Sequence, residues 1–236
     1  MFDYSTTLNP ATLPNPILTA SGCAGSGKEL SQFFALQELG AVVTKSIMLK
    51  PRSGRATPRM AETPSGMLNS IGLQGPGVDI FLENDIPWLQ SQGARVIVSI
   101  AGETVDDYAA LARRVRGIPN LVGIEVNISC PNVENRGMVF SCHPDTARAA
   151  IENVRRNVGS DIPIIAKLSP DVTDITLIAR EVVHAGADGV ALINTVLGMV
   201  IDVHSMRPKL AQKTGGLSGP AIRPIAVRAV YQVHSA

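Results

Sequence analysis

Residues at the end of one predicted strand combine a thiol with several amide and hydroxyl groups. Residues 121–126 have the apolar, β-branched composition of a short buried strand, and Asn127-Ile128-Ser129-Cys130-Pro131-Asn132 follows them directly. Pro131 has no N–H group to donate, so the strand ladder ends there. A lone cysteine at a strand end is usually a small buried hydrophobe. The polar neighbours favour a second interpretation, in which Cys130 is a reactive thiol beside amides that read a ligand.

Polar or small residues follow nearly every predicted strand of the chain. Six short apolar segments are predicted as strands, at residues 17–20, 41–44, 96–100, 123–126, 164–166 and 189–193. The residues at or near their ends are Ser21, Lys45 and Ser46, Ser99, Asn127, Lys167, and Asn194 and Thr195. Since the carboxyl ends of parallel strands meet at one edge of a sheet, we expect these side chains to lie close together.

Helical patterns separate the predicted strands. They cover residues 29–39, 78–92, 104–116, 145–158, 173–185 and 221–234. Alternating strands and helices indicate an α/β fold with a parallel sheet, either doubly wound or closed as a (β/α)8 TIM barrel. The polar strand ends favour the barrel, whose active sites lie at the carboxyl end of the strands, and no GxGxxG motif follows the first strand.

Six strand–helix units are fewer than the eight of a closed barrel. We therefore expect residues 1–236 to form a single barrel domain that is incomplete at its C-terminal end, apparently lacking the last two βα units. The loops of those two units commonly form the phosphate-binding site of such barrels.

Composition excludes several classes of function. The formal net charge of +1 gives no electrostatic reason to expect nucleic acid or an anionic membrane surface as a partner. No apolar run reaches the ~18 residues of a membrane-spanning helix. Three cysteines without a CxxC spacing predict neither a disulfide framework nor a zinc site, and fit a reducing cytoplasm. Cys142 and His143 have no second ligand pair at usable spacing, so no metal is expected.

Seven motifs, taken in order, resemble one family. They are Thr19-Ala20-Ser21-Gly22, Thr44-Lys45-Ser46, Asn69-Ser70-Ile71-Gly72-Leu73-Gln74, Asn127-Ile128-Ser129-Cys130-Pro131-Asn132, Lys167-Leu168-Ser169-Pro170, Ile193-Asn194-Thr195 and Gly215-Gly216-Leu217-Ser218-Gly219. From residue 17 to the end, the chain resembles the soluble class 1 dihydroorotate dehydrogenases and is most similar to the 1B subgroup. The resemblance implies an FMN-containing barrel oxidoreductase that converts dihydroorotate to orotate in pyrimidine (UMP) biosynthesis. Class 2 members have an N-terminal membrane-associating extension, which is not expected here, and a serine in place of Cys130.

The resemblance also implies roles for individual residues. Cys130 would be the catalytic base, a role that suits a thiol because its pKa of ~8.5 is far closer to neutrality than that of an alcohol. The implied substrate-binding residues are Lys45, Asn69, Ser70, Ile71, Gly72, Leu73, Asn127, Asn194 and Thr195. The implied FMN-binding residues are Ser21, Lys45, Ser46, Ser99, Asn127, Lys167, Ile193 and Gly219. Asparagine side chains both donate and accept hydrogen bonds, which suits the imide edges of these ligands. Position 99 departs from the family, which usually has asparagine there.

Two other functions remain open at this point. A dihydropyrimidine dehydrogenase-like barrel would share the thiol and the flavin but reduce uracil or thymine; such enzymes are normally much longer and carry iron–sulfur motifs, which this chain lacks. A non-catalytic barrel subunit is the second alternative, and the intact Cys130 counts against it. Two segments have a second interpretation: residues 54–77 could be a surface loop, although the resemblance favours a cover over the substrate, and residues 215–219 could be an ordinary turn.

The resemblance finally suggests protein partners. It implies a homodimer and, for the 1B subgroup, an iron–sulfur flavoprotein subunit that passes electrons to NAD. Members of the 1A subgroup use fumarate instead, and the residues of this chain do not distinguish the two acceptors.

Overall fold

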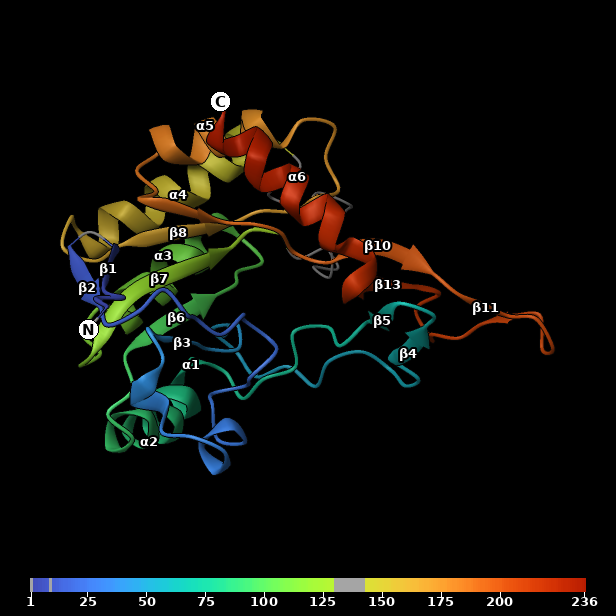
Figure 1. Cartoon of the computed structure of the whole chain (residues 1–236), viewed down its shortest axis with the longest axis horizontal. Helices are drawn as coiled ribbons and strands as arrows, with labels where there is room; N and C mark the ends of the chain where they lie inside the picture. The colour runs from blue at the N-terminus through green and yellow to red at the C-terminus, as the bar shows by residue number, and fades with distance from the viewer. Residues whose placement is uncertain (1, 9, 130–142) are drawn as a thin grey trace.

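A five-stranded parallel sheet forms the centre of the molecule (Figure 1). The computed structural model describes residues 2–8, 10–129 and 143–236. Neighbouring strands lie in the order β3 (Val42–Val43), β6 (Val96–Ile100), β7 (Leu121–Asn127), β8 (Ile164–Lys167) and β9 (Gly189–Ala191). A parallel bridge between Leu18 and Ala41 places the first predicted strand beside β3. The six predicted strand segments therefore lie side by side in chain order.

Helices cover one face of this sheet. They are α1 (Val78–Ile80), α2 (Ile86–Ser91), α3 (Val105–Val115), α4 (Pro144–Val158), α5 (Ile175–His184) and α6 (Arg223–His234). Residues of helices α1 to α6 share one apolar cluster with alternate strand residues such as Val98, Ile124 and Val126. The intervening residues Ile97 and Ile165 face the other way, into a second small cluster. Helices on a single face are expected of a barrel wall and not of a doubly wound sheet, so the fold is TIM-barrel-like.

The later helices begin and end close to their predicted positions. Helix α3 begins with a capping box, in which Thr104 Oγ1 accepts from the backbone N–H of Asp107 and Asp107 accepts from that of Thr104. From this helix the buried Tyr108 hydroxyl donates to the backbone carbonyl of Asn127 at 2.9 Å. Helix α3 thereby fixes the end of strand β7, where the polar motif begins.

Two predicted helices are corrected by the structure. Residues 29–39 form two short 3-10 turns, η1 (Leu30–Gln32) and η2 (Leu36–Glu38), separated by an extended Ala35. The extended residue lets Leu36 reach the core, where it is 1% exposed, and this burial outweighs the local helical pattern. Residues 78–92 are helical but contain a π-helical turn, η3 (Phe81–Asp85). Pro87 explains the turn, because it has no N–H for the carbonyl of Glu83.

A second, antiparallel sheet projects from the carboxyl end of the parallel strands (Figure 1). Its strands lie in the order β10 (Val196–Met199), β13 (Thr214–Ser218), β5 (Gly66–Asn69) and β4 (Met60–Thr63). Two further hairpins pair β1 (Thr6–Leu8) with β2 (Ala11–Leu13), and β11 (Ile201–Asp202) with β12 (Arg207–Pro208). Residues 215–218, from the segment for which a turn was one interpretation, form most of strand β13; Gly219 lies outside the strand, and Pro220–Ile222 then forms the turn η5 before α6.

Candidate active site

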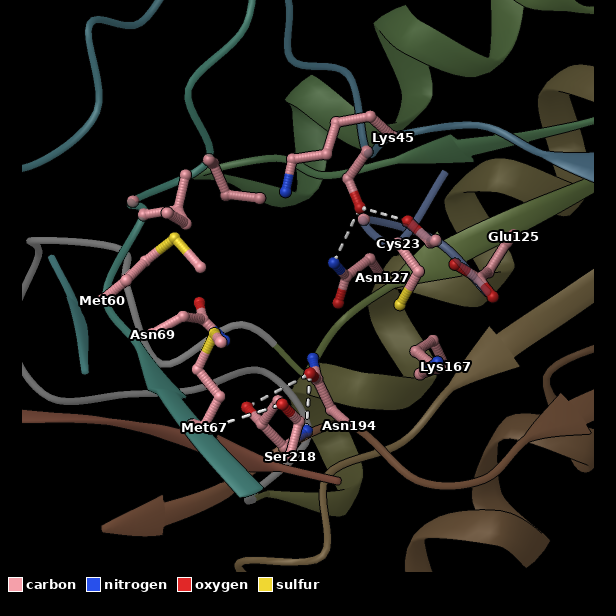
Figure 2. A pocket seen from close by; sticks show the side chains of 17 residues that line it. Cys23, Lys45, Met60, Met67, Asn69, Glu125, Asn127, Lys167, Asn194 and Ser218 are labelled. Atoms are coloured by element: carbon pink, nitrogen blue, oxygen red, sulfur yellow. Dashed lines mark hydrogen bonds between the residues drawn. The ribbon is translucent and has the colours of Figure 1, made fainter. Parts of the chain in front are cut away.

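A cavity of ≈ 380 Å³ lies between the carboxyl ends of the parallel strands and the second sheet (Figure 2). Eleven of the sequence-predicted site residues line it: Ser21, Lys45, Ser46, Asn69, Ile71, Gly72, Leu73, Asn127, Lys167, Asn194 and Thr195. They come from the ends of the parallel strands, from the end of β5 and from the segment that follows it. The polar residues at the ends of the predicted strands therefore lie together, as expected. The 54–77 segment forms strands β4 and β5 and also lines part of the cavity.

The Asn127 side chain is held from both sides. Its Nδ2 donates to Ser46 Oγ at 2.9 Å, and its Oδ1 accepts from Ser129 Oγ at 2.9 Å. The same Ser129 oxygen accepts from Asn194 Nδ2 at 2.7 Å. Because the two amides share one serine, their orientations are coupled. Asn194 is also tied to its neighbour, since its Oδ1 accepts from the backbone N–H of Thr195 at 2.8 Å.

The charged lining residues give the cavity a positive balance. Among the residues that line it, Lys45 and Lys167 oppose one carboxylate, Glu125. Lys167 ends strand β8 directly opposite Asn127 in the sheet register, and Lys45 follows β3. In Figure 2 the Lys45 side chain extends across the cavity above Asn127. A small site with this balance favours an anionic ligand.

Close approach of strand β13 to Thr195 in the cavity wall depends on a glycine. A Cβ atom added to Gly216 would lie 2.0 Å from Thr195 Oγ1, a distance that no packed side chain tolerates. Strand β13 therefore passes directly against Thr195 only because position 216 has no side chain. Gly216, from the segment for which a turn was one interpretation, is needed for this contact between the second sheet and the cavity wall.

Four predicted site residues lie outside the cavity lining. Ser70 and Ser99 are buried behind it, at 1% and 0% exposure. Ile193 packs against the main core, and Gly219 precedes the turn η5 with a φ of +97°. Cys130, the predicted base, lies outside the residues that the structure describes.

Sequence reasoning missed six residues of the cavity: Gly22, Cys23, Met60, Met67, Glu125 and Ser218. Glu125 carried a usable signal, because it shares the two-residue period of strand β7 with Asn127 and must point to the same face. Met60, Met67 and Ser218 belong to the second sheet, whose strands had not been predicted. Cys23, a free and exposed thiol, follows the first predicted strand, at residues 17–20, by a few residues.

Two negative findings apply to the described part of the chain. Within residues 2–8, 10–129 and 143–236, no cluster of three or more histidine, cysteine or acidic side chains could hold a metal ion. No helix in those same ranges is long and apolar enough to cross a membrane.

The fold and the cavity together define a TIM-barrel-like α/β protein with a polar cavity at the carboxyl ends of its strands. The sequence profile of the dihydroorotate dehydrogenase family matches residues 4–236, and the chain belongs to this family. The predicted resemblance is thereby confirmed.

Similar proteins with known names support a more specific assignment within the family. The chain is 52% identical over 225 residues to the catalytic subunit of dihydroorotate dehydrogenase B (NAD(+)) from Desulforudis audaxviator, covering 95% of this chain and 73% of that protein. It is 49% identical to the same subunit from Anoxybacillus flavithermus, covering 95% and 72% of the two chains. A crystal structure of the Eimeria tenella enzyme in complex with ferulenol shares the fold, with a TM-score of 0.73 at 20% identity, over 99% of this chain and 69% of that one. These relatives support the 1B subgroup.

Proposed function

We propose that this chain oxidises dihydroorotate to orotate in pyrimidine biosynthesis and that FMN is its cofactor. The observation that carries the proposal is the meeting of Lys45, Asn127 and Asn194 in one cavity. Dihydroorotate has a carboxylate and a ring of amide donors and acceptors. The Lys45 ammonium group would complement the carboxylate, and the side-chain amides of Asn127 and Asn194 would complement the ring. Family membership and the names of the relatives support the same reaction.

The cavity also fits the flavin by the chemistry of its donors. The pyrimidine edge of a flavin alternates hydrogen-bond acceptors with an N–H donor, and the cavity lining offers hydroxyl, amide and ammonium groups at Ser21, Asn127 and Lys167. When bound, FMN would accept the hydride from the substrate. Lys167 would stabilise negative charge at this edge of the site.

The protein's own contribution to the reaction is positioning and proton removal. Oxidation breaks two C–H bonds on adjacent carbons: the proton beside the carbonyl goes to a base, the hydride leaves the neighbouring carbon, and a C=C bond forms. Cys130 is proposed as that base. We expect Cys130→Ala to retain the cofactor but to slow its reduction roughly 10²–10⁴-fold, the usual contribution of a general base. A wild-type rate of reduction in Cys130→Ala would reject the assignment.

The visible absorbance spectrum of the purified protein tests the function. We expect a yellow protein whose extracted cofactor is FMN, and whose flavin band is bleached by dihydroorotate without oxygen. Bleaching by dihydrouracil alone would identify the uracil-reducing alternative. Absence of any bound flavin, together with no affinity for orotate, would favour the non-catalytic alternative.

Further features of the proposal follow the B-type relatives. We infer a homodimer, an iron–sulfur flavoprotein partner subunit that passes electrons to NAD, and a cytoplasmic location; co-purification with the partner and NAD-dependent turnover are the corresponding measurements. The single-domain interpretation and the two additional strand–helix units of a closed barrel also stay predictions. The intact mass of the source protein tests the second of these.

A further inference from the structure

A row of polar side chains runs beneath the cavity from Asn127 to Glu125. Asn127 Nδ2 donates to Ser46 Oγ at 2.9 Å, and Ser46 Oγ lies 2.9 Å from Ser99 Oγ. Ser99 Oγ in turn donates to Glu125 Oε1 at 2.9 Å. Ser99 is fully buried and Glu125 is 4% exposed, so bulk water does not compete for these hydrogen bonds.

The carboxylate at the end of the row decides its direction. Ser99 Oγ has a single proton and donates it to Glu125 Oε1. Ser99 can then only accept from Ser46, which uses the single proton of Ser46 as well. Ser46 is left to accept from Asn127 and from Ser21, whose Oγ lies 3.2 Å away. The Glu125 acceptor thus sets the direction in which the three hydroxyl groups of Ser99, Ser46 and Ser21 donate.

This direction determines what the cavity offers to a ligand. Ser21 turns its proton toward Ser46, so its lone pairs are available to a ligand N–H group. Asn127 directs one Nδ2 proton to Ser46 and retains the second as a donor. The opposite side of the Asn127 amide agrees with this orientation, because Oδ1 accepts from the backbone N–H of Ser129 at 3.3 Å. Without a carboxylate at the end of the row, the hydroxyls could rotate and offer a donor in place of an acceptor.

We propose that Glu125 is a positioning residue that acts through Ser99 and Ser46 to orient Asn127 and Ser21 toward the ligand. The identity of the ligand, orotate beside FMN, rests on the proposed function; the hydrogen-bond direction does not. Glu125→Gln removes the directional bias, because an amide can present either an oxygen or an N–H group to Ser99. Ser99→Ala interrupts the row while leaving the carboxylate in place.

A double-mutant cycle on orotate affinity tests the proposal. Orotate dissociation constants are measured on the FMN-loaded protein from the change in its visible spectrum. We expect Glu125→Gln and Ser99→Ala each to weaken orotate binding about 5-fold, the size of one net hydrogen bond. The double variant should also lose about 5-fold, because both changes break the same row. Ile165→Val is the matched control, since Ile165 pairs with Glu125 in the sheet register, and its orotate affinity should equal that of the wild type.

A second measurement needs no ligand. The side-chain amide signal of Asn127 in a ¹H–¹⁵N spectrum, assigned by its loss in Asn127→Asp, should move in Glu125→Gln and in Ser99→Ala but not in Ile165→Val. A double variant that loses about 25-fold in orotate affinity, the product of two independent effects, would overturn the proposal. So would an Asn127 signal that stays in place in both variants of the row. If the wild-type protein binds no orotate, the proposed function fails, and the amide signal alone decides whether the row exists.

Discussion

Near the carboxyl ends of the parallel strands, the two faces of the sheet carry opposite kinds of side chain, although the same strands supply both. On β7, Ile124 and Val126 are fully buried against the helices, whereas Glu125 and Asn127 alternate with them and face the cavity. At the end of β7, the period of two places the apolar side chains on the core face and the polar ones on the cavity face. The comparison shows that one strand can contribute apolar residues to the core and polar residues to the proposed site, because alternate residues point to opposite faces.

The two faces also differ in what holds their side chains in place. On the helix-covered face, stability comes from apolar area removed from water, about 1.5–3 kcal/mol for each fully buried aliphatic side chain. On the cavity face, buried polar groups are tolerated because they satisfy one another, as Ser46, Ser99 and Glu125 do. Substitutions on the first face should therefore change folding, and those on the second should change binding.

The largest expected effect is on the helix-covered face. Ile124→Ala should lower the free energy of unfolding by about 2–5 kcal/mol, because it leaves a cavity among packed side chains. Urea denaturation measures this loss. Val183→Ala on α5, where Val183 is 52% exposed, should change stability by less than about 0.5 kcal/mol. Equal effects of the two substitutions would show that the helix-covered face is not the main source of stability.

On the cavity face, Lys45→Met should act on binding. It keeps the aliphatic stem and removes the ammonium group, and a hydrogen bond to a charged partner is worth about 1.5–3 kcal/mol, or roughly 10- to 100-fold in affinity. Orotate titration of the FMN-loaded protein measures the change. Lys50→Met is the control, because Lys50 is exposed outside the cavity lining. If Lys45→Met bound orotate as tightly as Lys50→Met, the claim that substitutions on the cavity face change binding would be contradicted.

A glycine substitution probes the contact between the second sheet and the cavity wall. Gly216→Ala should displace Thr195, at a cost of about 1–3 kcal/mol in stability, and weaken orotate binding. Gly189→Ala is the matched control variant, because a Cβ atom added at Gly189 meets no atom within 4 Å. Thermal unfolding and orotate titration of both variants separate the two cases. Unchanged orotate affinity in Gly216→Ala would mean that Thr195 does not contribute to the site.

The smallest effect concerns the start of helix α3. Thr104→Ala should cost about 1 kcal/mol in stability through loss of the capping hydrogen bond, and Thr104→Ser should restore most of it. Orotate affinity should stay at the wild-type value, because Thr104 is not among the residues that line the cavity. A fall in orotate affinity would connect the helix layer to the site more directly than the two-face comparison allows.

Much of the fold was predictable because the parallel strands are continuous and apolar. Burial on both faces selects β-branched residues, so segments such as 96–100 and 164–166 are recognisable without any tertiary information. Helices α3, α4 and α5 were also predicted within two residues, since their apolar residues repeat with the helical period. The segment 29–39 failed for a physical reason: burial of Leu36 against the core overrode its helical pattern.

The candidate site was predictable in part for the same reason. Lys45, Asn127 and Lys167 stand out as polar residues at the ends of apolar strands, and topology brings such ends together. The second sheet gave no such signal, because its strands are short, rich in glycine and partly exposed. Met60 and Met67 could not be placed in the cavity without those strands.

The sequence by itself determined the order of the parallel strands and of most helices between them, the family and the polar residues at the strand ends, because these depend on local composition and on short motifs. The tertiary structure decided which groups touch. The row from Asn127 through Ser46 and Ser99 to Glu125 joins four residues from three segments of the chain. Hydrogen bonds depend on distances and directions of a few tenths of an ångström. Such distances are set by how strands β6 and β7 and the segment after β3 pack together, and no local pattern encodes them.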